Sequence, residues 1–530
     1  MIILYQTSYM RLLTCLFLIV FLSLHVHAQD SSLVVSAPIN VSKDGWTYLL
    51  QLSNGNTLLF HFEQKKNIIV KVFDKGGKET HHNEITSSLV DTKTLDKRAV
   101  INIFETNGQG LLFIKQMIDK KSTMMRLCFD ISNGTLLNEK VLFSLDKSYY
   151  PSRTIVLNTE NNTGYTVMYS YLQYQEKNEW LYTKLLRFNT KGEMIKELPV
   201  TLPLKGFDEA RVTNADIDQD GNIVFAIELT KAIQYGDSYD RTMGVVYIYA
   251  ETGTVKYNTV VLPKRLRLGH TFFSFNSFVN TINVYLSMVP DFSIENLNSG
   301  ALNNVYQSVY VFPIDLTSGI AKKLSGEVSR NYISNIRRTA DAKFSGLLTD
   351  AMTDSRGVSY VCFEEETLDW DKTGSETNKV YRGNIAITQY DDTFKEMSSV
   401  VFPMSHFEVL NFETINTSDN NDFYRVRFVF GKKSQFVLFN DYEENFDKTL
   451  ADAIKMVDNC NKTQAMYYSI GKRYKIHKGY FLNSPANGIY ESVCINSIDF
   501  NDNTNTVAAI FKHIEGNKST LHIAWRKMED

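Results

Sequence analysis

The chain has few cysteines, and this scarcity limits how it can be stabilised. Only five occur in 530 residues, and four of them follow residue 28, so the protein is no disulfide-dense scaffold. No pair has the spacing of a metal site. Cys128 and Cys362 lie in apolar strand patterns, where a buried thiol is expected. Cys460 and Cys494 could pair after export, and the sequence leaves this disulfide open.

The sequence also lacks the short motifs of common enzyme classes. It contains no Gly-x-Ser-x-Gly elbow, no His-Glu-x-x-His metal motif, no Walker loop and no dinucleotide fingerprint. Its ten histidines are scattered along the chain. We therefore expect neither a nucleophilic nor a metal-dependent hydrolase of a familiar type, and no bound cofactor.

Neither surplus positive charge nor a long internal apolar run is present. The 56 basic residues against 59 acidic ones lack the electrostatic footprint of a nucleic-acid-binding protein. One apolar run, residues 12–24, follows Arg11 and precedes a small-residue cleavage pattern ending at Ala28. This run is shorter than a membrane-spanning helix, which needs about 20 apolar residues. We therefore predict a signal peptide over residues 1–28, no transmembrane segment after its cleavage, and a periplasmic, cell-surface or extracellular location.

Aromatic residues are abundant, and they accompany a weak internal repeat. The 29 tyrosines and 33 phenylalanines favour the pleated, half-buried surfaces of strands. Roughly every 50–75 residues, a short polar turn opens onto a β-branched or aromatic strand, which is the spacing of a radial β array. Five such turns are Asn54-Gly55-Asn56, Asn107-Gly108-Gln109-Gly110, Asn162-Thr163-Gly164, Asp220-Gly221-Asn222 and Ser355-Arg356-Gly357.

These units resemble the blades of the β-propeller superfamily over nearly the whole chain after residue 28. The resemblance implies an all-β propeller of seven or eight blades, forming one domain over residues 29–530. The last unit lacks an outer strand, and Ser32–Ile39 offers a spare one that can pair with the strand ending near Lys527. No Trp-Asp dipeptide of the WD40 type and no sialidase-type Asp box occurs, so no functional residue carries over from a subfamily.

One segment departs from the strand pattern. Leu450, Ile454 and Val457 recur at helical spacing, which predicts a short helical insertion over residues 447–457 with Asp447 as its N-cap. The segment 440–445, which contains Asp441, Glu443 and Glu444, precedes it. Insertions into a repeat often lie on a functional face, but capping of the helix is the simpler interpretation here.

A second local motif copies the start of a calcium loop. Asp216, Asp218 and Asp220 occupy positions one, three and five, and Gly221 occupies position six. Position twelve is Ile227 instead of a bidentate Glu. Because Asp-Gly is also a strong hairpin signal, a turn is the favoured interpretation and calcium the weaker one.

Candidate binding residues are aromatic, and candidate acids form one short run. Tyr and Trp at loops bury much area at little entropic cost, although the same residues can simply pair across strands. The acidic, aromatic stretch Glu364–Asp371 could supply an acid and a base, but a solvated hairpin loop is the simpler interpretation. The aromatic candidates are Tyr174, Trp180, Tyr235, Tyr239 and Trp370.

These observations favour an exported protein that binds a protein or glycan at an envelope or extracellular surface, without catalysis. One alternative is a carbohydrate-active or other hydrolase whose acids come from several blades. Another is a structural component of an envelope assembly. Converging carboxylates with perturbed pKa values near the central axis would favour the hydrolase, whereas exposed aromatic residues there would favour the binder.

Overall fold

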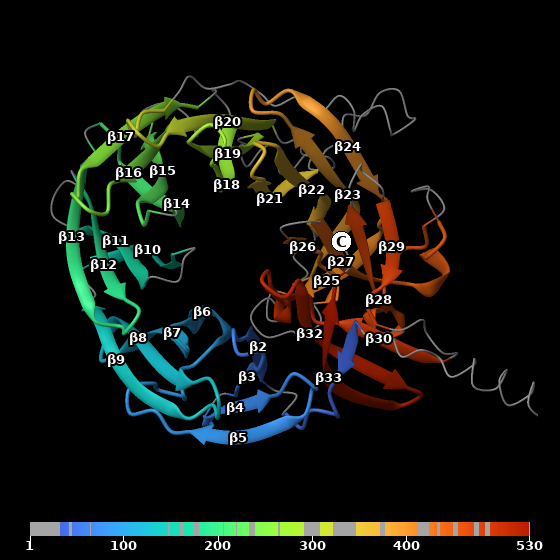
Figure 1. The fold of residues 1–530 in the computed structure, drawn as a ribbon. Helices are drawn as coiled ribbons and strands as arrows, with labels where there is room; N and C mark the ends of the chain where they lie inside the picture. Colours follow the sequence, from blue (N-terminus) through green and yellow to red (C-terminus); the bar gives the residue numbers. More distant parts are fainter. Residues whose placement is uncertain are drawn as a thin grey trace, which may run out of the picture.

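The computed structural model is a ring of antiparallel β-sheets (Figure 1). It describes residues 32–528 apart from a set of gaps. The gaps are 42–44, 64, 147–148, 160–163, 174–179, 205, 219, 233–238, 263–265, 291–307, 322–345, 371–376, 412–422, 432–434, 449–453, 471–475 and 483–487. No helix in the part of the chain outside these gaps is long and apolar enough to cross a membrane.

Six blades follow one another along the chain, each built from neighbouring strands. Blade 1 contains β2 (Trp46–Gln51), β3 (Thr57–Phe62), β4 (Ile68–Phe73) and β5 (Glu79–Ile85). Blade 2 contains β6 (Val100–Thr106), β7 (Gln109–Ile118), β8 (Lys121–Asp130) and β9 (Leu136–Leu145). Blade 3 contains β10 (Tyr149–Asn158), β11 (Gly164–Gln173), β12 (Trp180–Asn189) and β13 (Met194–Pro203).

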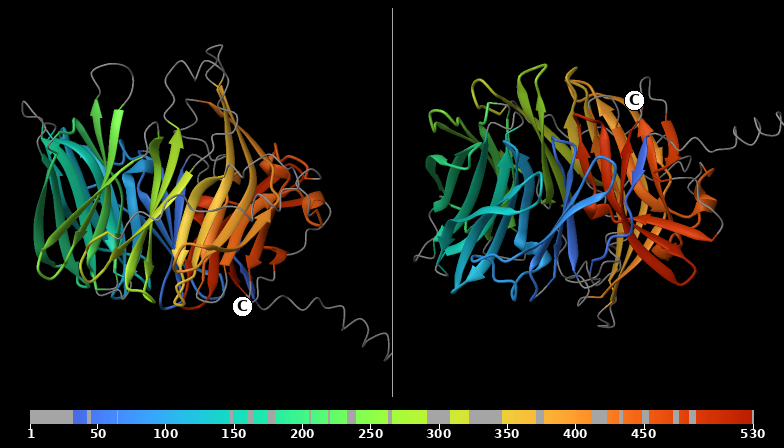
Figure 2. Two further views of the ribbon diagram at one scale, coloured as in Figure 1. Left: turned by 90° about the horizontal axis from the view of Figure 1, so that it is seen from above. Right: turned by 60° about the horizontal axis from the view of Figure 1, so that its bottom comes forward.

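The next three blades differ in their outer strands. Blade 4 contains β14 (Glu209–Ile217), β15 (Ile223–Ala232), β16 (Tyr239–Ile248) and β17 (Val255–Val261). Blade 5 contains β18 (Leu266–Asn276), β19 (Thr281–Pro290) and β20 (Ser308–Asp315). Blade 6 contains β21 (Leu347–Thr353), β22 (Ser359–Trp370), β23 (Thr377–Tyr390), β24 (Glu396–Phe402) and β25 (His406–Asn411). Both β24 and β25 pair with β23, so its long hairpin with β22 extends beyond the other strands on one side of the ring (Figure 2).

The remaining nine-stranded sheet divides into two blades. Only one parallel residue pair, Gln464 with Glu491, joins the two halves. Blade 7 contains β26 (Arg427–Phe430), β27 (Gln435–Asp441), β28 (Gln464–Ile470) and β29 (Ile476–Tyr480). Blade 8 contains β30 (Ile489–Val493), β31 (Asp499–Asn501), β32 (Thr506–Glu515), β33 (Lys518–Lys527) and β1 (Leu33–Val35). The described strands therefore form a β-propeller of eight blades, within the seven or eight that the repeat predicts.

The two ends of the described chain meet in blade 8, which confirms the predicted closure. Val34 lies opposite Trp525 in an antiparallel ladder, and the amide of Lys527 donates to the carbonyl of Ser32 over 2.7 Å. The regular strand is shorter than the Ser32–Ile39 segment expected, but the amide of Ile39 still donates to Leu521. Pairing across the seam removes the open edge that β33 would otherwise present.

The predicted helix over residues 447–457 is wrong for the residues that the structure describes. Val457 instead forms a parallel bridge with His406, and its amide and carbonyl bond to Ser405 and Phe407 over 2.8 Å each. These sheet-type bonds use the groups that a helix would need. Asp447 follows the short 3-10 turn Glu443–Asn445, and no helix begins there within the described residues. The described part of the chain also has short 3-10 turns at Lys97–Ala99, Cys460–Lys462 and Ile495–Ser497.

Apolar side chains fill the space between neighbouring blades, so each blade buries both of its faces. Phe60 of blade 1 packs edge-on against Phe129 of blade 2, with ring centroids 5.2 Å apart. Phe73 of blade 1 contacts Trp525 of blade 8 at 5.9 Å, which extends the packing across the seam. This arrangement explains why a long chain needs no single large core.

Asparagines also join the innermost strands of adjacent blades. Asn102 donates from Nδ2 to the carbonyl of Val156, and Asn214 donates to the carbonyl of Thr271, each over 2.9 Å. Both asparagines directly follow a β-bulge, which turns the side chain toward the next blade. The innermost strands are thus held together around the central axis, where side chains from different blades converge.

Candidate functional site

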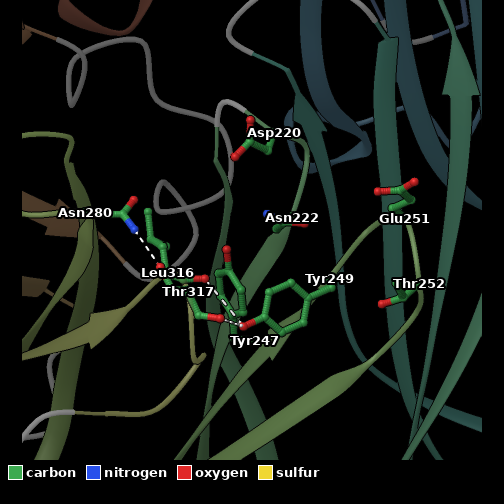
Figure 3. Close-up of a pocket in the computed structure, with 9 residues that line it drawn as sticks. All are labelled: Asp220, Asn222, Tyr247, Tyr249, Glu251, Thr252, Asn280, Leu316 and Thr317. Atoms are coloured by element: carbon green, nitrogen blue, oxygen red, sulfur yellow. Dashed lines mark hydrogen bonds between the residues drawn. The ribbon is translucent and has the colours of Figure 1, made fainter.

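A cavity lies between blades 4 and 5, next to the turn that joins β14 and β15. We call this end of the ring, where first strands turn into second strands, the turn face, and the opposite end the loop face. The cavity has a volume of about 570 Å³, which is within the range of small-ligand sites. It is lined by Asp220, Asn222, Tyr247, Tyr249, Glu251, Thr252, Asn280, Leu316 and Thr317 (Figure 3).

The turn beside this cavity is held by one buried carboxylate. Asp218 is 2% exposed, and its Oδ1 accepts from the amides of Asp220 (2.9 Å) and Asn222 (2.8 Å). Its Oδ2 accepts from Asn222 Nδ2 (2.9 Å) and from the Tyr247 hydroxyl (2.7 Å). Burial and this bond to Asp218 raise the pKa of Tyr247, so the phenol stays protonated as a donor. Asp218 therefore builds the wall of the cavity and is not available to a ligand.

Tyr249 and blade 5 form a second rigid wall. The Tyr249 hydroxyl donates to the carbonyl of Thr317 over 2.7 Å, and Asn280 donates from Nδ2 to the Thr317 hydroxyl over 3.0 Å. The Tyr247 and Tyr249 rings meet edge to face with centroids 5.1 Å apart. Because these side chains are bonded to one another, the cavity is shaped before any ligand arrives.

Two carboxylates at the cavity have no such partners. The exposed side chains of Asp220 and Glu251 line it from two turns of blade 4 (Figure 3). Neither carboxylate makes a hydrogen bond or an ion pair with a residue that the structure describes. The free lining is thus rich in acceptors and negatively charged. It suits a ligand group that donates hydrogen bonds.

The predicted calcium residues separate in space. Asp216 accepts the amide of Ile217 over 2.8 Å within β14, Asp218 is enclosed in the turn, and Asp220 opens to the cavity. In the described part of the chain, no three His, Cys, Asp or Glu side chains gather closely enough to hold a metal ion. Calcium binding at these residues stays a prediction.

Three of the five predicted aromatic residues lie at the loop face, away from the cavity. Trp180 begins β12 and is 43% exposed. Tyr239 begins β16 and Trp370 ends β22, which places both backbones at the same face, although their side chains are not described. Tyr174 and Tyr235 lie outside the described residues. Their role in binding stays a prediction.

The two cysteines proposed to pair share one apolar cluster. Cys460 is buried with Phe423, Tyr424 and Tyr442, and Cys494 packs against the same cluster. Both are present as thiols. Burial raises the pKa of the Cys460 thiol, which makes it a weak nucleophile in this state. A disulfide between them stays a prediction.

The acidic run Glu364–Glu366 is part of strand β22, and the solvated loop expected from the sequence is wrong. Arg382, itself 6% exposed, lies 3.5 Å from Glu364 and 3.2 Å from Glu366. Its Nη1 also donates to Glu408 of β25 over 2.9 Å. Burial raises the pKa of Glu364 to about 7 despite the opposing charge of Arg382. One buried guanidinium is thus paired with three carboxylates, and the charge of Arg425 also opposes the shift of Glu364.

Sequence reasoning missed a pair of acids on the innermost strands. Asp350 of β21 and Asp499 of β31 each have a pKa raised to about 6 by burial. The charge of Arg427, on β26 of the blade between them, opposes both shifts. The only local signal is a carboxylate within an otherwise apolar strand, such as Asp350 in LLTDAMT.

Comparisons with known proteins find structural likeness only. No protein-family model and no curated protein matches the chain. The structure of the Dos1 propeller aligns over 94% of this chain and 96% of its own, with 9% identity and a TM-score of 0.43. The polysaccharide lyase Uly1 aligns over 84% of this chain and 93% of its own, with 10% identity and a TM-score of 0.41. An apocarotenoid oxygenase mutant from Synechocystis aligns over 94% of this chain and 90% of its own, with 10% identity and a TM-score of 0.33. Similarities this low say nothing about activity, and the propeller assignment rests on the sheets themselves.

Proposed function

We propose that the chain is an exported binding protein whose cavity between blades 4 and 5 takes a hydrogen-bond-donating group of a protein or glycan partner. The observation that carries the proposal is the pair of carboxylates, Asp220 and Glu251, that line a preformed cavity and have no described donor. Sugar hydroxyls and ammonium groups are donors of this kind. The ring of Tyr249 adds an aromatic surface to the same cavity.

Export is the second part of the proposal, and it rests on residues 1–28. Arg11, the apolar run after it and the small residue Ala28 have the order of a secretory signal. The N-terminal sequence of protein recovered from an exporting host tests this step. Cleavage that leaves Gln29 first supports it, and retention of residues 1–28 contradicts it.

Removing both free carboxylate charges is expected to weaken binding about tenfold to a hundredfold, since a hydrogen bond to a charged group contributes about 1.5–3 kcal/mol. The double variant Asp220→Asn, Glu251→Gln tests this. Isothermal titration with a neutral maltohexaose, a chitosan hexamer and a hexalysine peptide separates a hydroxyl ligand from an ammonium ligand, and a glycan from a protein partner.

Glu84→Gln is the matched control, because Glu84 is an exposed carboxylate on β5 far from the cavity. It should bind the same probe as the unchanged protein does. Absence of binding by every probe, or equal binding by the double variant, contradicts the proposal.

A hydrolase is the second candidate, and Asp350 and Asp499 favour it. Glycoside hydrolysis needs one protonated and one ionised carboxyl group. Burial raises the pKa of both acids to about 6, and Oδ2 of Asp499 already accepts the amide of Gln51 over 2.6 Å. If the candidate is right, release of reducing ends from a polysaccharide should be greatest near pH 6. Asp350→Asn should abolish that release. A flat pH profile, or activity retained by the variant, excludes these acids.

A further inference from the structure

Two exposed arginines lie on adjacent innermost strands near the loop face. Arg153 belongs to β10 of blade 3, and Arg211 belongs to β14 of blade 4 (Figure 1). Their strands β10 and β14 contact each other, and burial together with the charge of Arg211 lowers the pKa of Arg153. Arg153 makes no hydrogen bond or ion pair with a described residue.

The neighbouring carboxylate does not neutralise this charge. Glu228 of β15 is 5% exposed and pairs with Arg211 over 2.6 Å, but it also pairs with Arg241 over 3.3 Å. Glu228 therefore pairs with two guanidiniums, and Arg153 has no carboxylate partner among the described residues. The Arg211 side chain remains 62% exposed, so its remaining donors face solvent.

His270 of blade 5 lies between these arginines and the acidic group of blade 6, since the charges of Arg211 and Glu366 both act on it. His270, exposed on innermost strand β18, has a pKa lowered by burial first and by the Arg211 charge as well, against the opposing effect of Glu366. Glu366 belongs to the set of carboxylates around Arg382. On the innermost strands that the structure describes, Arg153 and Arg211 therefore belong to blades 3 and 4, where the exposed Glu209 also begins β14, and the carboxylates around Arg382 belong to blade 6.

The cationic site is separate from the cavity in Figure 3. Arg211 and Glu228 form a residue pair close to the end of β14 where the strand begins, whereas the cavity adjoins the turn after its last residue, Ile217. Both arginines lie on strands, and the ion pair with the buried carboxylate of Glu228 positions Arg211 before a ligand arrives.

We propose that Arg153 and Arg211 form a second binding site, which holds the oxyanion groups of an acidic polysaccharide. A guanidinium matches the planar carboxylate of a uronic acid, and the oxygens of a sulfate ester, with two parallel hydrogen bonds. Like charges that lie together without an anion are stabilised when one binds between them. A long acidic glycan can extend from this site across the mouth of the ring.

The test uses affinity electrophoresis of the mature protein in gels that contain polygalacturonate, dextran sulfate or neutral dextran. We expect retardation by a charged polymer and none by dextran, with the retardation decreasing as salt is raised from 50 to 300 mM. Retardation by polygalacturonate alone identifies a carboxylate ligand, and retardation by dextran sulfate alone identifies a sulfate ligand.

The double variant Arg153→Gln, Arg211→Gln should lose at least tenfold in affinity for the retarding polymer. It leaves Glu228 paired with Arg241, and the single variant Arg153→Gln, which breaks no described contact, serves if the double variant does not fold. Arg356→Gln is the matched control, since Arg356 is exposed on the turn face and pairs only locally with Asp354 and Tyr360.

Two results would overturn the proposal. One is the absence of retardation by both charged polymers, and the other is equal retardation of the double variant and the unchanged protein. The Asp220→Asn, Glu251→Gln variant should bind the polymer normally. The failure of this site and the failure of the proposed cavity can therefore be told apart.

Discussion

Replacing Arg382 with Met is expected to lower the free energy of unfolding by about 3–5 kcal/mol at pH 8, the usual cost of removing one partner from a buried ion pair. Arg382 is the only cation bonded to Glu364, Glu366 and Glu408 among the described residues. Met fills a similar volume but leaves three carboxylates together on strands that are largely buried. Chemical denaturation followed by circular dichroism measures the change.

The cost of Arg382→Met should shrink at pH 5. The pKa of Glu364 is already about 7 in the folded protein, above its ordinary value of 4.5, and loss of Arg382 raises it further. Between those two values the folded state binds more protons than the unfolded state, so stability falls as pH rises. Protonation at pH 5 therefore removes part of the repulsion, and a penalty that is equal at both pH values would contradict this account.

Arg356→Met provides the control for that measurement. Arg356 bonds to Asp354 over 2.6 Å, but its side chain is 71% exposed. Exposed pairs contribute about 0–1 kcal/mol because water and salt screen them. A loss as large as that of Arg382→Met would show that burial of the charge cluster is not the cause.

A chain that begins at Val41 is expected to self-associate and to have a free energy of unfolding lower by about 3 kcal/mol or more. A chain that begins at Ser32 should behave like the mature protein. The shorter chain lacks β1 and the bonds from Lys527 to Ser32, from Ser36 to Ile523 and from Ile39 to Leu521. Each such bond contributes about 0.5–1.5 kcal/mol.

The self-association has a separate cause, which is the edge of β33. Without β1, the backbone groups of β33 have no partner on that side and can pair with another molecule. Size-exclusion chromatography and thermal unfolding of the two chains make the comparison. A monomeric, equally stable chain from Val41 would show that β1 does not close the ring.

The apolar strands could be predicted because their period and turns are local properties of the sequence. The outermost strands were harder. Glu79–Ile85 of β5 reads ETHHNEI and is mostly exposed, so no apolar pattern distinguishes it from a loop. It becomes a strand because Ile68–Phe73 offers it an edge to pair with. The helix prediction failed for a similar reason, since the backbone of Val457 is used by a strand far back in the chain.

The sites depend even more on distant residues. Asp220 could be singled out from its turn, but the cavity beside it also needs Asn280 and Thr317 from blade 5. Glu364 looked solvated because its neighbours along the chain are polar, whereas Arg382 and Glu408 come from later strands. Contacts between residues so far apart in the chain cannot be predicted from a short segment of the sequence.

The closure of blade 8 also determines when folding can finish. The side chain of His522 bonds to the carbonyl of Ser36, 486 residues earlier in the chain. The first strand, β1, therefore has no partner to pair with until almost all of the chain has been synthesised. Because contacts of such long range form slowly, we expect completion of this blade to limit the folding rate. A circular permutant that joins β1 directly after β33 should fold faster than the natural order of strands.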